Sequence, residues 1–180
     1  VLRSEVKADR DFPAFDRVMM DGYAIRAADW ATGTRCFQVV GQAPAGMPQT
    51  ALAGENTCIE VMTGAPCPQG ADCVIPVEDL VGMEPAGARF RETAEISAGK
   101  FIHGKGSDIG SGAVVLSEGI LLGGREIGVA ASCGAGWLEV ARQPTISVVA
   151  TGDELVGVDE QPADHQIRQS NAHALAAVLE

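Results

Sequence analysis

The amino-acid sequence predicts a mainly β fold with some α-helix, in which a β-rich part is followed by the first strand and first helix of an incomplete α/β domain. The chain of 180 residues contains 22 glycines and 9 prolines, but only 4% aromatic residues. This composition is typical of a protein with many turns and short strands. Near its end, an apolar run precedes a helical stretch, which is the order in which an α/β domain begins.

The β-rich part is a series of short apolar runs separated by turn residues. Asp21-Gly22, followed by alternating apolar residues, predicts a tight turn that leads into a strand. Residues 27–30 favour a helical turn, and we expect the glycine-rich segment 99–112 to be a loop. Strands are expected in four runs that are rich in β-branched residues or alternate in polarity: CFQVVGQ, TCIEVMTG, DCVIPVEDL and ARFRETAEI.

The pattern changes after residue 112. AVVLSEG and ILLGG predict a hairpin, residues 125–132 predict a helix that Gly134 terminates, and WLEVAR predicts another strand. TISVVA, at 145–150, is typical of a buried parallel strand. Ser170-Asn171 then begins a helix that runs to the chain's end. Because a lone parallel strand cannot bury both faces, and because residue 1 is valine, we expect a piece of a longer gene product.

Charge and composition exclude several classes of protein. The formal net charge of −11 repels polyanions, so nucleic acid is not an expected partner. No stretch is apolar for long enough to cross a membrane, and the N-terminus lacks a signal-peptide core. The five cysteines lack zinc-knuckle or redox-motif spacing, which indicates packed, reduced thiols of a cytoplasmic protein. With only three histidines, carboxylates holding a hard cation are the metal site that the sequence can supply.

Two polar clusters lie in the first half of the chain. Asp21 stands at a turn beside Gly22, where a plain turn aspartate is the simplest interpretation and a functional acid the alternative. Thr63-Gly64 follows the run IEVM. A hydroxyl and exposed glycine amides at a strand end would form an anion cradle.

Two further clusters follow. In the segment 103–108, two glycines around Lys105 would let backbone and ammonium approach a phosphate or oxyanion together, with Asp108 near a cation; the alternative is a flexible surface loop. Thr151-Gly152-Asp153-Glu154 comes directly after the apolar run. Ligands of open α/β sheets bind at the carboxyl ends of strands, so these two acids could hold magnesium or orient a water molecule.

The order and wording of these clusters resemble one family. Five blocks match in sequence order, from about Asp11 onward: PAFDRVMMDGYAI, VMTGAPCPQGADCVIPVED, GSDIGSGAVVLSEG, ASCGAGWLEVARQPTISVVATGDELV and QIRQSN. They resemble the molybdopterin molybdenumtransferases, which include bacterial MoeA and the E domain of gephyrin.

The resemblance implies an L-shaped homodimer whose active site is shared between subunits. Residues 1–11 and 107–143 would belong to a mixed dimer-arm domain, and residues 12–106 to an inserted β-rich domain. Residues 144–180 would open the α/β domain that binds molybdopterin, and we expect that domain to be truncated here.

The resemblance also implies a reaction. Adenylylated molybdopterin and molybdate would react with magnesium present, AMP would be released, and molybdenum would remain on the dithiolene sulfurs. Asp21, Asp108 and Glu154 would be the catalytic acids, and with Asp153 they would form the magnesium site. Substrate contacts would come from six residues: Thr63, Gly64, Lys105, Thr151, Gly152 and Asn171.

Two positions depart from the family pattern. His103 stands where an arginine is expected, and Val18 where serine is common. The family's glycine-rich SGG segment and later lysines lie outside this sequence, so we expect this chain alone to lack turnover. The alternatives are a non-catalytic dimerisation or scaffold module of the same family and an unrelated β-rich carrier domain with chance matches.

Overall fold

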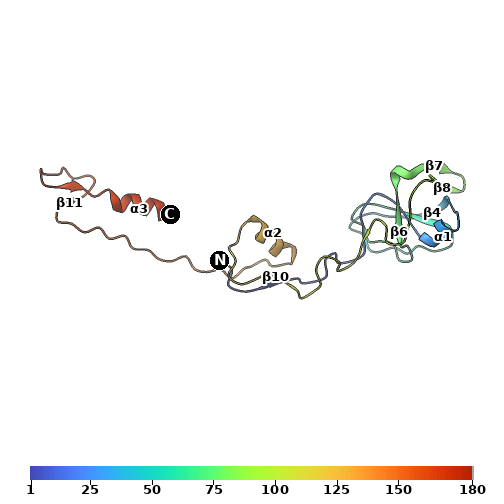
Figure 1. The fold of residues 1–180 in the computed structure, drawn as a ribbon, viewed down its shortest axis with the longest axis horizontal. Helices are drawn as coiled ribbons and strands as arrows, with labels where there is room; N and C mark the ends of the chain where they lie inside the picture. Colours follow the sequence, from blue (N-terminus) through green and yellow to red (C-terminus); the bar gives the residue numbers. More distant parts are fainter. Residues whose placement is uncertain (180) are drawn as a thin grey trace. The chain divides into compact units, whose positions relative to one another are not determined.

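The computed structural model describes residues 1–179, which fall into two compact units: Val1–Val140, and the residues from Ala141 onward. Most of the regular structure of the first unit is β-sheet, which confirms the predicted fold class (Figure 1). No helix among the described residues is long and apolar enough to span a membrane.

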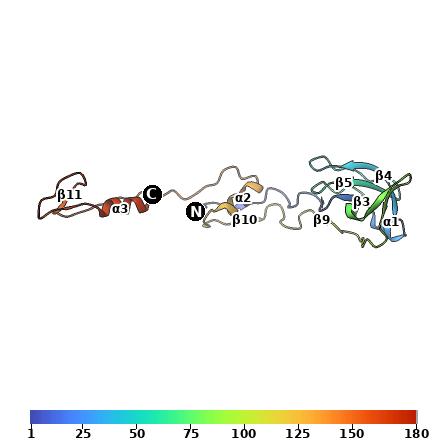
Figure 2. The ribbon, with the colours of Figure 1, turned by 90° about the horizontal axis from the view of Figure 1, so that it is seen from above.

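The largest sheet of the first unit has six strands. Its order is β6 (Cys73–Pro76), β3 (Gly22–Ile25), β5 (Thr57–Val61), β4 (Cys36–Ala43), β8 (Gly87–Phe90) and β7 (Leu80–Glu84). Of these, β3, β4 and β5 are labelled in Figure 2. Strand β3 runs antiparallel to both of its neighbours, β4 is parallel to β5, and the remaining pairs are antiparallel.

The part of this sheet that β6, β3 and β5 form is buried on both faces. Successive residues of a strand point to opposite faces, and Cys73 and Ile75 of β6 pack into one apolar cluster while Val74 packs into another. The first cluster holds the aromatic side chains Tyr23, Trp30, Phe37 and Phe90, with Trp30 supplied by the short helix α1 (Ala27–Ala31). Burial on both faces explains why these strands are continuously apolar in sequence.

A third apolar cluster lies around the helix α2 (Gly124–Ser132) and joins residues from both ends of the first unit. Strand β1 (Val6–Lys7) pairs with β10 (Val114–Leu116), so Leu2, Val6 and Leu116 share this core. Helix α2 matches the predicted helix, and Gly134 follows it with a φ of +75°. Glycine accepts this left-handed conformation without strain.

Several expected strands are confirmed and others need correction. The runs CFQVVGQ, TCIEVMTG and the first part of DCVIPVEDL contain β4, β5 and β6. The rest of the third run is the 3-10 turn Val77–Asp79, followed by an unexpected strand, β7. In ARFRETAEI the strand ends at Phe90. Within the predicted loop 99–112 the pair Ile102–His103 forms a short strand, β9.

The predicted hairpin after residue 112 is wrong. Val114–Leu116 pairs with β1 instead of with ILLGG, and the Ile120 carbonyl accepts a hydrogen bond from the Leu2 N–H at 2.9 Å. The predicted strand WLEVAR is also wrong, since Val140 forms only an isolated bridge to Leu2. In both places the N-terminal segment supplies the partner that a local hairpin would have needed.

The second unit contains two short parallel strands, β11 (Leu155–Val156) and β12 (Ile167–Arg168), and the helix α3 (Asn171–Leu179). The expected helix is confirmed. Residues 145–150 do not form the expected buried strand, and Ile146 and Val149 are more than half exposed. Within the part of the chain that the structure describes, no strand pairs with this run, and an apolar strand cannot be buried without neighbours.

Candidate functional site

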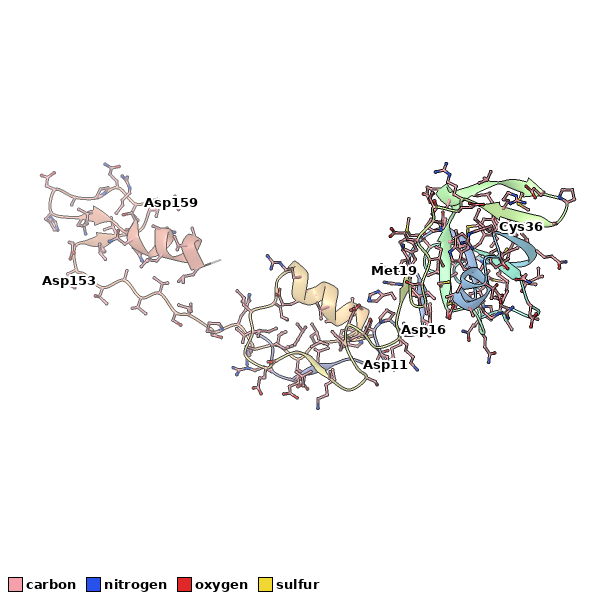
Figure 3. The ribbon with its side chains drawn as sticks, turned by 45° about the vertical axis from the view of Figure 1, so that its right-hand side comes forward. Asp11, Asp16, Met19, Cys36, Asp153 and Asp159 are labelled. Atoms are coloured by element: carbon pink, nitrogen blue, oxygen red, sulfur yellow. The ribbon has the colours of Figure 1, made fainter. Side chains whose placement is uncertain are left out.

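Strand β2 (Arg17–Val18) lies between two of the segments singled out from the sequence. On one side, the Val18 N–H donates to the Ala65 carbonyl and the Gly64 N–H donates to the Val18 carbonyl, both at 2.9 Å. On the other side, β2 pairs antiparallel with β9, which places Arg17 opposite His103. Asp16 and Met19 mark the two ends of β2 in Figure 3. The strand therefore joins the threonine segment to the histidine segment.

Asp21 and Thr63 are in direct contact. One carboxylate oxygen of Asp21, Oδ1, accepts the Thr63 N–H at 2.7 Å and the Thr63 hydroxyl at 2.8 Å. These hydrogen bonds lower the pKa of Asp21 below its ordinary value, because they stabilise the ionised form more than the opposing desolvation disfavours it. The carboxylate of Asp21 is thus held in place directly before the first residue of β3.

The expected anion cradle at Thr63-Gly64 does not form in this arrangement. The Thr63 N–H is donated to Asp21 and the Gly64 N–H to the Val18 carbonyl. The Gly64 amide that was expected to hold an oxyanion, and the Thr63 N–H beside it, therefore already have acceptors within the chain. The hydroxyl oxygen of Thr63 still has acceptor lone pairs.

His103 connects two charged residues. Its Nε2 lies 2.8 Å from Oδ1 of Asp108, and its Nδ1 lies 3.3 Å from a terminal nitrogen of Arg17. Because a guanidinium group only donates hydrogen bonds, Nδ1 accepts and Nε2 carries the proton that is donated to Asp108. Asp108 is thereby fixed in orientation by the strand pair β2–β9.

Lys105 is held by two other acids of the N-terminal segment. Its N–H donates to Oδ1 of Asp16 at 2.8 Å, and its ammonium lies 3.6 Å from Oδ2 of Asp11. The Lys105 side chain remains 59% exposed, so this ion pair is solvated and weak. Lys105 can still reach an anion, but the predicted approach of backbone N–H and ammonium together is not seen, because Asp16 takes the N–H.

A shallow pocket of about 230 Å³ lies where these segments meet. It is lined by Arg17, Val18, Met19, Thr63, Gly64 and His103. The pocket brings together residues of two clusters that are far apart in the sequence, and the Asp21 and Asp108 carboxylates bind its lining residues Thr63 and His103. The polar side chains of its lining supply a hydroxyl, a guanidinium and an imidazole group, and these groups suit a small anion.

In the second unit, a pocket of about 260 Å³ includes Thr151 and Asn171 in its lining. Asp153 lies in the turn that precedes β11 (Figure 3). The backbone of Glu154 accepts a hydrogen bond from the Ile167 N–H at 2.8 Å, while Thr151, Gly152, Asp153 and Glu154 are all exposed. Thr151 and Asn171 are therefore brought together, whereas the two acids do not line this pocket.

The four acids expected to bind magnesium are divided between the two units. Within residues 1–179 no group of three or more acidic, histidine or cysteine side chains is arranged to hold a metal ion. Magnesium commonly takes only one or two protein carboxylates and completes its shell with water and substrate phosphates. Asp21 and Asp108 each use Oδ1 for a protein donor. They fit magnesium as single ligands in a site that a substrate completes, and not as a preformed cage.

Arg17 and Asp16 were not predicted as site residues. Nothing in their local pattern distinguishes them from surface charges, because their positions depend on pairing with residues more than eighty positions away. The departure at His103 was the sequence signal that could have found Arg17. Where an expected cation is missing, a neighbouring cation is a candidate to replace it.

The fold is a β-rich domain whose sheet is buried on both faces where β6, β3 and β5 lie. Its connecting segments bring acids, a threonine and an arginine to a pocket that suits a small anion. Residues 1–134 match the family model described as the MoeA N-terminal region (domain I and II). The chain belongs to this family, which confirms the resemblance drawn from the ordered blocks.

Relatives and solved structures agree with this assignment. The chain is 38% identical over 180 residues to a molybdopterin molybdenumtransferase of Synechocystis sp., covering 100% of the chain and 46% of the relative. It is 34% identical over 184 residues to that of Staphylococcus aureus, covering 100% and 43%. A molybdopterin biosynthesis MoeA protein from Pyrococcus horikoshii superposes with a TM-score of 0.81 at 27% identity, over 99% of this chain and 46% of that one. The chain thus spans less than half the length of these relatives.

Proposed function

We propose that the protein containing this chain acts in molybdenum cofactor biosynthesis and inserts molybdenum from molybdate into adenylylated molybdopterin, with release of AMP. The observation that carries the proposal is the junction made by β2, which brings the Asp21–Thr63 pair and the His103–Asp108 pair to one pocket. The family and the relatives' name, molybdopterin molybdenumtransferase, support a role in molybdenum cofactor biosynthesis.

The chemistry asks for two kinds of group. Phosphate and molybdate need positive charge and hydrogen-bond donors, and the hydrolytic step needs an oriented water molecule. Magnesium, when bound, would neutralise phosphate oxygens and acidify that water. On this proposal Asp21 and Asp108 of the first unit are cation ligands that orient water, and Glu154 with Asp153 of the second unit has the same role. Thr63 acts through its hydroxyl, Lys105 through its ammonium and Gly64 as part of the pocket lining. The six residues proposed to contact substrate are thus Thr63, Gly64, Lys105, Thr151, Gly152 and Asn171.

We further propose a cytoplasmic homodimer. Apolar side chains that are normally buried are exposed around α2: Trp137 is 96% exposed and Leu121 is 78% exposed, and Ile127 of the helix is about half exposed. Exposed apolar surface of this kind is typical of an assembly face. It supports the dimer arm expected from the resemblance, with residues of one subunit's site facing its partner.

The test is cofactor synthesis by the complete gene product. Supplied with adenylylated molybdopterin, molybdate and magnesium, the Asp21→Asn and Glu154→Gln variants should form cofactor at least about a hundredfold more slowly than the wild type. Asp159→Asn, an exposed acid of the second unit, is the matched control. Equal rates in all variants would contradict the proposal.

The non-catalytic scaffold remains the second candidate, and the exposed apolar surface around α2 is the observation that favours it. It predicts that Asp21→Asn and Glu154→Gln leave cofactor formation unchanged, while Trp137→Ala weakens self-association in sedimentation. The enzyme proposal predicts loss of synthesis in both acid variants. The same protein preparations therefore separate the two candidates.

A further inference from the structure

The pocket beside β2 carries a positive charge that the sequence did not reveal. The chain as a whole has a formal net charge of −11, so a bound anion requires a local cation. Among the described residues that line this pocket, Arg17 is the one lysine or arginine. Lys105 does not line it, and its ammonium faces Asp11 at 3.6 Å. The permanent positive charge of the pocket therefore resides on Arg17.

The position of Arg17 is fixed by the strand pairing. Arg17 lies directly opposite His103 in the β2–β9 pair, and one guanidinium nitrogen contacts Nδ1 of His103 at 3.3 Å. A guanidinium group has five N–H donors. A single contact to His103 orients the side chain at the pocket and leaves further donors for a ligand.

The neighbouring groups suit the same ligand. The Thr63 hydroxyl and the His103 ring share the pocket lining with Arg17, and Asp21 and Asp108 are bound to Thr63 and His103 respectively. Two carboxylates so close to the pocket would repel an oxyanion unless a cation intervened. The guanidinium group of Arg17 suits the role of this cation, because guanidinium binds phosphate-like oxygens through two parallel hydrogen bonds.

We propose that Arg17 binds an oxyanion of the substrate in this pocket and supplies the positive charge that His103 does not. This inference rests on the proposed function and deepens it. The oxyanion has two possible sources with the same chemistry, a phosphate of the adenylylated substrate or molybdate. Arg17 would then be a substrate-binding residue, with His103 acting as the link that orients Asp108 beside it.

The test measures binding of AMP and, separately, of sodium molybdate to the 180-residue chain by NMR titration. Arg17→Gln should weaken binding of the relevant anion by about tenfold or more, because it removes a charge-assisted contact. Arg17→Lys keeps the charge without the paired donors, so its affinity for the anion should lie between those of the wild type and Arg17→Gln. Arg91→Gln, in the exposed turn after β8, removes the same charge elsewhere and should bind like the wild type.

A double variant that moves the positive charge from position 17 to position 103 distinguishes ligand binding from a purely structural role. In Arg17→Gln/His103→Arg the cation moves across the strand pair to the opposite position, and anion binding should recover to within a few-fold of the wild type. A structural role for Arg17 would give no recovery. Loss of AMP binding alone would identify the phosphate as the ligand, and loss of molybdate binding alone would identify the oxometalate.

Two results would overturn the inference: equal affinity of wild type and Arg17→Gln for both anions, or binding of neither anion by the wild type. Either result leaves the proposed function standing if Asp21→Asn still abolishes cofactor synthesis in the complete gene product. Conversely, Arg17-dependent anion binding without Asp21-dependent synthesis would retain the anion pocket and reject the enzyme.

Discussion

Oδ1 of Asp21 accepts both hydrogen bonds that Thr63 can donate, the backbone N–H at 2.7 Å and the hydroxyl at 2.8 Å. The contact is a consequence of strand register. In the β3–β5 pair, Gly22 lies opposite Val61, so the residue before β3 and the residues after β5 meet at the same end of the sheet. A carboxylate held in this way is ionised and oriented before any ligand binds.

Removing the Thr63 hydroxyl should raise the pKa of Asp21. Thr63→Val keeps the side-chain shape and the backbone N–H but deletes one of the two hydrogen bonds that lower this pKa. The pKa should move up toward the ordinary value of 3.8, as measured by NMR of the Asp21 carboxyl carbon across pH. Thr63→Ser retains the hydroxyl and serves as the control. An unchanged pKa in Thr63→Val would show that the hydroxyl does not reach Asp21.

The same contact predicts a pH dependence of stability. The pKa of Asp21 is lower in the folded protein than its ordinary value of 3.8. Its contribution is therefore fully present above about pH 4 and is lost as the pH falls through the folded-state pKa. Urea midpoints measured between pH 6 and pH 2 should fall less steeply for Asp21→Asn than for the wild type. Identical slopes would contradict the prediction. Asp159→Asn, in the second unit, controls for the change in net charge.

Gly22→Ala should destabilise the sheet severely. A Cβ at this position would lie 2.0 Å from the carbonyl oxygen of Ile75, which belongs to the paired strand β6. Because the obstacle is backbone, relief requires the strands to separate, and we expect a loss of about 3 kcal/mol or more in the free energy of unfolding. Urea unfolding measures the loss.

Gly82→Ala is the matched control for Gly22→Ala, since nothing lies within 4 Å of a Cβ at that position. It should change the midpoint little, and both variants carry the same chemical change in a strand of the same sheet. If the two variants unfold at the same denaturant concentration, the close approach of β3 to β6 is not the source of the effect.

The strands that sequence reasoning placed well are those with strong local signals. Cys36–Ala43 and Thr57–Val61 are bounded by breakers and rich in β-branched residues. Strand β7 escaped notice because it follows Val77–Asp79 without a glycine or proline between them, and its Val81 and Met83 are exposed. The false hairpin at residues 113–124 has the same origin, since the true partner of Val114–Leu116 is β1, at the other end of the unit's sequence.

The candidate site shows the same division. Asp21, Thr63 and Asp108 were identifiable because each is a carboxylate or hydroxyl beside or within two residues of a glycine in a matched block. Their proximity in the folded protein was not identifiable from the sequence, because it depends on the pairing of β2 with segments far along the chain. Arg17 illustrates the limit: its sequence neighbours indicate nothing, whereas its cross-strand neighbour His103 gives it a position at the pocket.

The cysteines offer a test of the first apolar cluster, which contains both Cys58 and Cys73. Burial raises the pKa of Cys58 and of Cys73 to about 12 and that of Cys67 to about 11, from an ordinary 9.0. Cys58 and Cys73 have no exposed surface, whereas Cys36 is partly exposed. Since the thiolate is the reactive form, iodoacetamide at pH 8 should label Cys36 first and should reach Cys58 and Cys73 only when urea unfolds the protein.

Mass spectrometry of peptides from native and urea-treated protein measures the labelling at each position. Urea-treated protein, in which all five cysteines should react, shows that each peptide is detectable. Labelling of both Cys58 and Cys73 at the rate of Cys36 in native protein would mean that β5 and β6 both separate from β3. We expect that opening to loosen Asp21 as well, because Asp21 directly precedes β3 and its partner Thr63 follows β5. Slow labelling therefore reports on the integrity of the Asp21–Thr63 contact as well as on the core.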